Sequence, residues 1–271
     1  MSRAAHRVAA HFGEWLQGRL GPGGPVVLVT LACDALAATA THRPAADLSL
    51  VQPDPPVLSV PRLGRFLAAL GMPRTGAFRL RLDMPAGGGA GASTAALVAL
   101  ARAAGHHGPG LAAACRETEG ATDPLMLAHP DRWLWAPRHA EAIAPLPPPP
   151  RMTVIGGFLG PPQRTEPGDE DFPDIADLAA RWAESGGAAH RAGLASLSAA
   201  RTTALRGPAD DPLPELARDL GALGHARAHT GPARALLFPP GAAPAGAVAA
   251  LRAAGLTGVL HFETGLGSGG A

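Results

Sequence analysis

A glycine-rich stretch, residues 85–96, separates two segments with different patterns of hydrophobicity. Before it, residues 77–83 alternate apolar and basic side chains, which predicts a half-buried strand. After it, residues 97–104 are rich in helix-forming residues and are followed by Gly105, which predicts a helix that ends there. Glycines allow positive φ values and close approach of a ligand, and the free N–H groups at a helix start attract anions. The stretch therefore predicts a phosphate-binding loop, with a flexible turn as the alternative.

Two known phosphate-binding motifs can be compared with this loop. A Walker loop needs a lysine after its last glycine, and the chain contains no lysine, which excludes it. A loose dinucleotide fingerprint fits Gly87, Gly89 and Ala92. That fingerprint normally follows the first strand of a βαβ unit, whereas the residues before it here predict strands and turns. A nicotinamide enzyme is therefore kept as an alternative.

Composition limits the class of protein. The chain has 271 residues, a formal net charge of +1, few aromatic residues and no tyrosine, which argues against binding to nucleic acid or to an acidic membrane. Its two cysteines, Cys33 and Cys115, lie too far apart in sequence for a metal motif, and buried thiols are expected. No signal peptide or membrane-spanning run is recognisable, so we expect a cytoplasmic protein.

The first half of the chain predicts strands and short helices. Residues 6–18 predict a short strand that leads into a turn at Gly13, where Glu14 could be a surface carboxylate. Residues 26–30 and 34–42 predict two strands that pair with each other. The other elements predicted in this half are a helix at 61–70, the strand at 77–83, a helix at 109–118 and a strand at 132–135.

Residues 145–150 are nearly all proline and predict a boundary between two domains, residues 1–145 and 151–271. An acidic loop at 165–174 is expected to be solvated surface, and 265–270 a frayed tail. The elements predicted after the boundary are a strand at 152–155, helices at 174–184, 187–206 and 213–224, strands near 225–228 and 233–238, a helix at 243–254 and a strand at 258–262.

Three acidic residues follow the glycine-rich stretch in the sequence and could take part in phosphoryl transfer. If the loop holds a nucleoside triphosphate, phosphoryl transfer needs a divalent ion with hard oxygen ligands and a group that activates or orients the acceptor. Ser93 at the helix start could cap the helix or reach that ion. Glu117, Glu119 and Asp123 form the nearest acidic cluster. Taken alone, Asp123 before Pro124 could equally cap a turn.

Three segments together resemble the GHMP small-molecule kinases, which include galactokinase, homoserine kinase and mevalonate kinase. The central GHMP motif is similar to Pro85, Gly89, Gly91, Ser93 and Ala95 with their spacing. Residues 228–238 look like the third motif, a turn between strands, and residues 13–18 look like the first. Within this superfamily, the Gly-Glu-Trp-Leu-Gln-Gly form of residues 13–18, Ser-Thr-Ala at 93–95 and the acidic segment 119–123, which is one residue longer here, resemble the L-threonine kinases of cobalamin assembly.

The resemblance implies an α+β fold of two domains, the first like the second domain of ribosomal protein S5 and the second ferredoxin-like. It implies an enzyme that transfers phosphate from ATP, with Mg²⁺, to a hydroxyl group of a small molecule, L-threonine being favoured. Asp123 is implied as the catalytic base, and Ser93 and Glu119 as Mg²⁺ ligands, with Glu117 as the rival of Glu119. The implied nucleotide-binding residues are Pro85, Gly87, Gly88, Gly89, Ala90, Gly91, Ala92, Ser93, Thr94 and Gly231. The implied acceptor-binding residues are Glu14, Gln17, His229 and Thr230.

The chain departs from the family pattern at several positions. Ala92 replaces the first serine of the central motif, and Gly88 stands where the threonine kinases often carry lysine; Thr230 and Arg234 alter the third motif. A nucleotide-binding or regulatory protein that has lost catalysis is therefore the alternative function. The oligomeric state is left open, with a homodimer as one expectation.

Overall fold

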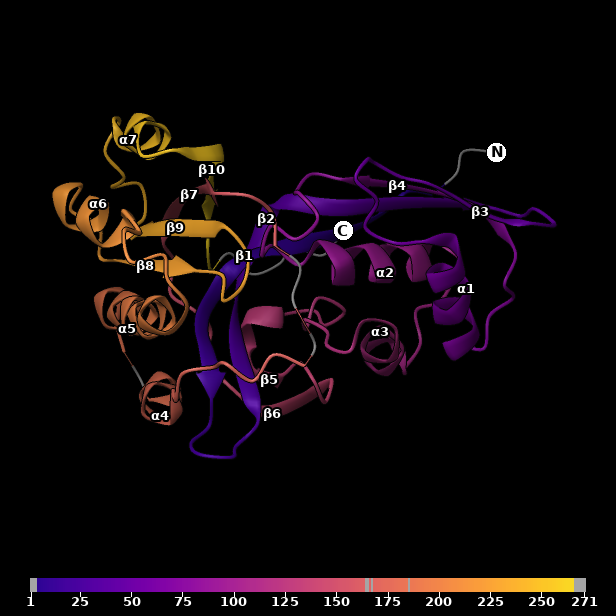
Figure 1. The fold of residues 1–271 in the computed structure, drawn as a ribbon, viewed down its shortest axis with the longest axis horizontal. Helices are drawn as coiled ribbons and strands as arrows, with labels where there is room; N and C mark the ends of the chain where they lie inside the picture. The colour runs from indigo at the N-terminus through magenta and orange to yellow at the C-terminus, as the bar shows by residue number, and fades with distance from the viewer. Residues whose placement is uncertain (1–3, 164–165, 167, 185, 266–271) are drawn as a thin grey trace.

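The computed structural model describes residues 4–163, 166, 168–184 and 186–265. Figure 1 shows the elements in space. In chain order they are β1 (His6–Arg19), β2 (Val26–Arg43), β3 (Leu48–Val51), α1 (Val60–Ala69), β4 (Gly76–Leu82), α2 (Ala92–Ala103), α3 (Leu111–Glu119), a 3₁₀ turn (Pro130–Arg132), β5 (Trp133–Ala136), β6 (Glu141–Pro145), β7 (Thr153–Leu159), α4 (Ala176–Ala183), α5 (Ala188–Arg206), α6 (Leu213–Asp219), β8 (Gly224–Arg227), β9 (Ala233–Phe238), α7 (Ala247–Ala253) and β10 (Leu256–Glu263). The expected tail at 265–270 lies outside the described residues, apart from residue 265.

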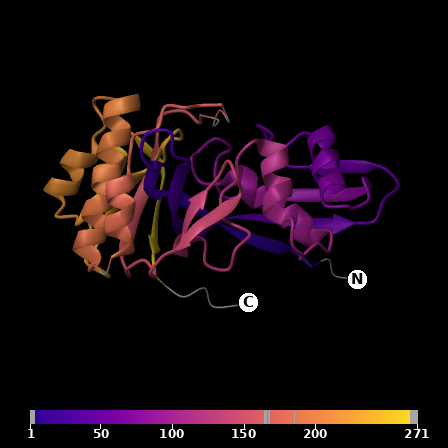
Figure 2. The ribbon, with the colours of Figure 1, turned by 90° about the horizontal axis from the view of Figure 1, so that it is seen from below.

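The strands form one sheet of ten strands with the order β10-β7-β9-β8-β1-β2-β4-β3, and β5 pairs with β2 and β6. Helices α4–α7 gather with β7–β10 at one end of the molecule, and α1–α3 with β3 and β4 at the other (Figures 1 and 2). Among the described strands, the β3–β4 pair alone is parallel. A nicotinamide site needs a parallel βαβ unit around its glycine loop, so that alternative is set aside.

Strand β1 holds the two ends of the sheet together. It pairs along β2 and contacts β8 through Glu14, which lies opposite both Thr30 and Arg227. Its register shifts around residues 9–16, and Gly13 takes a φ of +72° there. The predicted turn at Gly13 is therefore wrong: the positive φ makes a bulge inside one continuous strand.

The second correction concerns residues 26–42. They form one strand, β2, and do not fold back into a pair. The run from Val26 to Arg43 contains neither glycine nor proline, so nothing in it terminates the strand. Predicted helix 213–224 is also shorter in the structure, where α6 ends at Asp219 because Gly221 has a φ of +67°. The strand at 233–238 has the predicted ends, and the other predicted helices and strands are present with shifted ends.

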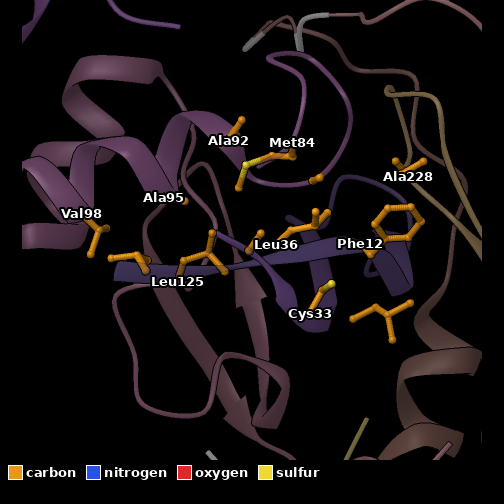
Figure 3. Packing of buried hydrophobic residues seen from close by; sticks show 14 of the residues in the cluster. Phe12, Cys33, Leu36, Met84, Ala92, Ala95, Val98, Leu125 and Ala228 are labelled. Atoms are coloured by element: carbon orange, nitrogen blue, oxygen red, sulfur yellow. The ribbon is translucent and has the colours of Figure 1, made fainter. Parts of the chain in front are cut away.

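Two clusters of buried side chains stabilise the sheet. The larger extends from β1 and β2 to α2, α4 and β7, and in it the rings of Trp15 and Trp182 lie 5.5 Å apart. Figure 3 shows the part of this cluster that includes Met84 and Ala92, which flank the glycine loop, and Phe12 of β1. The smaller cluster lies between α6, α7 and strands β7, β9 and β10. Cys33 and Cys115 are buried free thiols, as expected.

The proline run at 145–150 connects β6 to β7, and the sheet continues on both sides of it through β1 and β8. The domain boundary at this run stays a prediction. In the described part of the chain, no helix combines the length and hydrophobicity needed to cross a membrane.

The bulge in β1 gives a stability prediction. A Cβ atom at Gly13 would lie 2.8 Å from the backbone nitrogen of Ala228, whereas one at Gly21, with a similar φ of +78°, would meet nothing within 4 Å. We expect Gly21→Ala to cost about 1–2 kcal/mol for the left-handed conformation. Gly13→Ala should cost about 1–3 kcal/mol more, because the added methyl group overpacks the site. Urea unfolding of the two variants measures this difference, and equal losses would contradict the packing role of Gly13.

Candidate active site

The glycine loop, residues 85–92, connects β4 to α2. Gly87, Gly89 and Gly91 have φ values of +77°, +72° and +68°. Gly91 is the N-cap residue of α2, and no side chain caps the helix there. The N–H groups of the first turn therefore keep their capacity to bind an anion. The predicted strand–loop–helix arrangement is confirmed.

The loop packs directly against the turn between β8 and β9. A Cβ atom at Gly231 would lie 2.3 Å from the backbone nitrogen of Gly89, so no side chain fits between the two backbones. The amide of Ala233 donates a hydrogen bond of 3.1 Å to the carbonyl of Gly88. This contact joins the second and third segments that the sequence singled out.

The first segment joins the same loop. The amide of Gly13 in β1 donates to the carbonyl of Gly89 at 3.0 Å. On the outer side, the amide of Gln163 donates to the carbonyl of Gly87 at 2.8 Å. Backbone hydrogen bonds therefore fix the loop from both sides, and all three predicted segments meet at Gly89.

These segments enclose a cavity of about 360 Å³. It is lined by residues of β1, β2, α1, α2, α3 and several loops: His11, Glu14, Gln17, Val26, Leu28, Val57, Arg62, Ala86, Gly87, Gly88, Gly89, Gly91, Ala92, Ser93, Thr94, Glu119, Ala121, Thr122, Asp123, Pro137, Arg138, Gln163, Glu166, Phe172, Ala228, His229, Thr230 and Gly231. Of the predicted site residues, Pro85 and Ala90 alone lie outside this lining. Ala90 packs in the core, and the carbonyl of Pro85 accepts a hydrogen bond from Gly88 within the loop.

One end of the cavity holds Ser93, Glu119 and Arg62. The Ser93 hydroxyl donates to Oε2 of Glu119, and the Arg62 guanidinium lies 2.9 Å from Oε1 of the same carboxylate. Glu117 is exposed and does not line the cavity. One hydroxyl and one carboxylate thus lie together at the cavity, the hydroxyl from the start of α2 and the carboxylate from the end of α3.

Beyond them lies Asp123, whose carboxylate is 3.3 Å from Nε2 of His11. The amide of Asp123 donates to the Thr94 hydroxyl at 3.2 Å, which ties Asp123 to the first turn of α2. His11 is 3% exposed, and its Nδ1 lies 3.1 Å from the carbonyl of Gly13 and 3.7 Å from Oε1 of Glu14. A buried imidazole therefore lies between two carboxyl groups.

The pKa values in this group are shifted. Burial alone lowers the pKa of His11, but Asp123 and then Glu14 raise it by more, so that the pKa is about 9. Burial raises the pKa of Glu14 to about 7, against the opposing effect of His11. Glu14 is thus a buried carboxyl group and not the surface carboxylate that the sequence allowed. At neutral pH, His11 is charged beside Asp123.

Phe172 and His229 also line the cavity. Their rings stack with centroids 3.8 Å apart and 5° between planes, and the Arg138 guanidinium lies 5.4 Å from the centre of the Phe172 ring. Burial, and after it the Arg206 guanidinium, lower the pKa of His229 to about 3, so the imidazole is neutral.

Phe172 belongs to the acidic segment that was expected to be solvated surface. In the described residues 168–174, Glu170 pairs with Arg19 and, at 2.9 Å, with Arg138. Asp169 pairs with Arg206 at 2.5 Å. The segment is mostly exposed, as expected, with the Glu170 side chain 69% exposed, but these ion pairs hold it beside the cavity, which Phe172 helps to line.

A buried charge cluster supports the turn before β9. Arg234 pairs with Asp211 at 2.6 Å and donates to the carbonyl of Gly231 at 3.2 Å. Arg227 donates to the carbonyl of Ala228 at 3.1 Å. Both guanidinium groups are buried, and they orient the carbonyls at the two ends of the turn.

Sequence reasoning missed His11, Arg62 and Phe172. His11 lies only two residues before Gly13, so its position next to the first segment was a usable signal. Arg62 and Phe172 reach the cavity from α1 and from the acidic segment, far from any motif, and nothing local in the sequence marks them. Among the described residues, no three His, Cys, Asp or Glu side chains gather to hold a metal ion.

Comparison with known proteins gives the fold. The sequence matches no protein-family model and no curated protein. Mevalonate kinase from methicillin-resistant Staphylococcus aureus superposes with a TM-score of 0.59 at 14% identity, over 98% of this chain and 100% of that one. Mevalonate kinase from Methanococcus jannaschii gives 0.64 at 13% identity, over 97% and 98%. Phosphomevalonate kinase from Streptococcus pneumoniae gives 0.64 at 14% identity, over 97% and 99%.

The chain has the GHMP kinase fold. This confirms the predicted fold class. Homoserine kinase from Cytophaga hutchinsonii also matches, with a TM-score of 0.53 at 17% identity over 96% of this chain and 94% of that one. At these identities the likeness shows the fold, and the chemistry has to be argued from the side chains that this GHMP kinase fold carries.

The shifted pKa values give a second prediction. A group whose pKa is higher in the folded state contributes stability below its unfolded pKa and loses it as the pH rises through the folded value. For His11 that window runs from 6.5 to about 9. For Glu14 it runs from 4.5 to about 7. Above pH 7 the loss therefore comes from His11.

We expect the free energy of unfolding of the native protein to fall between pH 7 and pH 9 by an amount on the order of 2 kcal/mol. In His11→Gln this decline should be absent, while the decline between pH 4.5 and pH 7 persists. Urea unfolding at a series of pH values measures both. A variant that follows the native curve above pH 7 would show that His11 is not charged beside Asp123.

Proposed function

We propose that this protein is an ATP-dependent kinase that phosphorylates the hydroxyl group of a small molecule, with L-threonine as the favoured acceptor. The observation that carries the proposal is that the glycine loop, the Ser93–Glu119 pair and Asp123 all face one cavity. The solved structures with the same fold are kinases by name, which supports the reaction class. The threonine acceptor rests on the form of residues 13–18 and 93–95.

The loop would hold the triphosphate of ATP. The uncapped first turn of α2 and the positive-φ glycines present backbone N–H groups, which bind phosphate oxygens without a charged side chain. Gly231 would contribute from the facing turn, which packs on Gly89. A lysine-free chain can therefore bind the nucleotide through its backbone.

Ser93 and Glu119 fit a Mg²⁺ ion. Magnesium is held by one or two protein oxygen ligands, with phosphate and water completing the shell, and these two side chains already contact each other. The exposed position of Glu117, away from the cavity, supports Glu119 over this rival. When bound, the ion would neutralise charge on the transferred phosphoryl group. Arg62, which pairs with Glu119, would hold that carboxylate in place.

Asp123 is the proposed base. It would accept the proton of the acceptor hydroxyl as the hydroxyl oxygen attacks the terminal phosphorus of ATP and the bond from that phosphorus to the bridging oxygen breaks, releasing ADP. His11 would position its carboxylate through the 3.3 Å contact, and Thr94 would fix its backbone. Glu14, Gln17, His229 and Thr230 line the part of the cavity that remains for the acceptor.

A nucleotide-binding protein without catalysis is the second candidate. Ala92 lines the cavity without the hydroxyl that the family motif has there, and Arg62 occupies one oxygen of Glu119. Both features would weaken metal binding. The two candidates differ in turnover and share nucleotide binding.

A screen for ADP release separates these candidates. We expect ADP release to rise above the background ATPase rate with at least one member of a panel of amino acids, amino alcohols, sugars and simple alcohols, L-threonine first. Isothermal titration with Mg·ATP provides the parallel measure of binding. Binding of Mg·ATP with no phosphorylated product across the panel would favour the non-catalytic candidate.

Two matched substitutions test the roles of the carboxylates. Asp123→Asn should lower kcat by about 10²–10⁴-fold, because a general base contributes that much. Glu119→Gln should raise the Mg²⁺ concentration needed for half-maximal activity. Glu117→Gln, two residues away on the exposed side of α3, is the control and should leave both quantities unchanged.

Far-UV circular dichroism checks that each variant is folded. Native turnover in folded Asp123→Asn would refute the assignment of Asp123 as base. An unchanged Mg²⁺ requirement in Glu119→Gln, or an effect as large in Glu117→Gln, would refute the metal site.

A further inference from the structure

The acceptor end of the cavity contains three side chains with unpaired polar atoms. Oε2 of Glu14 and Oε1 of Gln17 are buried, and neither has a hydrogen-bond partner among the described residues. The same holds for both ring nitrogens of His229. Glu14 is 8% exposed and His229 4%, and all three residues line the cavity. Polar atoms this buried normally have partners.

The unpaired atoms of Glu14 and Gln17 are both hydrogen-bond acceptors. A carboxylate oxygen and an amide oxygen can only accept, so the missing partner has to donate. Leaving such groups unsatisfied costs about 1–3 kcal/mol each, more for a charged one. The site therefore calls for a ligand that brings several N–H or O–H donors to one place.

Neighbouring cations do not supply these donors. The closest cationic atom recorded near Glu14 is Nδ1 of His11 at 3.7 Å, and that nitrogen faces the Gly13 carbonyl at 3.1 Å. Arg227, opposite Glu14 across the sheet, is engaged by Thr203 at 2.7 Å and by the carbonyl of Gly207. Glu14 is thus a buried carboxyl group without a hydrogen-bonded cation, and burial raises its pKa to about 7.

We propose that Glu14 and Gln17 bind an ammonium group of the acceptor, so that the substrate class is small amine-bearing alcohols. This inference rests on the proposed kinase function. An ammonium group offers three N–H donors and one positive charge, which satisfies both unpaired oxygens. His229, neutral and stacked on Phe172, forms a wall that does not repel a cation.

The position of His11 relates the proposed ammonium site to the proposed base. Its two ring nitrogens lie 3.7 Å from Glu14 and 3.3 Å from Asp123. Both carboxyl groups therefore lie beside the same imidazole ring, so an amine bound at Glu14 and a hydroxyl bound at Asp123 can belong to one small molecule. A β-hydroxy amine is one acceptor of this kind.

Three related small alcohols test the proposal. L-Threonine carries both an amine and a carboxylate, 1-amino-2-propanol lacks the carboxylate, and 3-hydroxybutyrate lacks the amine. Isothermal titration in the presence of Mg²⁺ and a non-hydrolysable ATP analogue measures binding without turnover. We expect the two amines to bind at least tenfold more tightly than 3-hydroxybutyrate.

The variant Glu14→Gln keeps the shape of the side chain and removes its charge. It should weaken binding of both amines at least tenfold and leave the affinity for 3-hydroxybutyrate unchanged. Glu215→Gln, on the exposed surface of α6, is the matched control and should bind all three as the native protein does. Titration at pH 7 in buffers of different ionisation enthalpy should show proton release on amine binding in the native protein and none in Glu14→Gln.

Binding of 3-hydroxybutyrate as tight as that of the amines, equal affinities in Glu14→Gln, or no binding of either amine would overturn the proposal. The proposed kinase function is tested by different outcomes. Phosphorylation of alcohols without an amine would keep the kinase and reject the ammonium site. Amine binding that depends on Glu14, without ADP release from any alcohol, would keep the ammonium site and reject the kinase.

Discussion

The contact between Gly89 and Gly231 is the constraint on which the rest of the site depends. Two backbones approach so closely there that a single Cβ atom on Gly231 would lie 2.3 Å from the other chain segment. Through this contact the glycine loop of the α2 half meets the β8–β9 turn of the other half, and the Gly13 amide joins them from β1. The cavity exists because these three segments meet without side chains between them.

The local parts of this arrangement could be predicted from the sequence. Residues 85–96 carry their own signal, since glycines between a strand pattern and a helix pattern define a loop in any fold. The partners of that loop could not be derived in the same way. His11 and Phe172 acquire their roles from β1 and from the acidic segment, which reach the cavity only through the topology of the sheet. The bulge at Gly13 could not be predicted for a related reason. A glycine with positive φ can form a turn or a bulge, and the pairing of β1 with both β2 and β8 decides between them.

Because the chain contains no lysine, the cationic side chains that line the cavity are arginine or histidine. Arg62 and Arg138 are the guanidinium groups in the described lining of the cavity, and each is held by a carboxylate, Glu119 and Glu170 respectively. Neither is a free cation aimed at a phosphate. Attraction for the proposed nucleotide would therefore come from the N-terminus of α2 and the loop amides, which do not titrate.

His11 is the charged side chain that lies between two carboxyl groups of the cavity, those of Glu14 and Asp123. It contacts Asp123 on one side and approaches Glu14 on the other, and a Cβ atom at Gly91 would fall 2.5 Å from its ring. The imidazole is thus packed against the N-cap of α2 and cannot move away from either carboxyl group without disturbing the helix start. A cation bound at Glu14 would compete with His11 for that carboxyl group and leave the imidazolium more fully to Asp123. Acceptor binding and positioning of the proposed base would then be coupled through one buried ring.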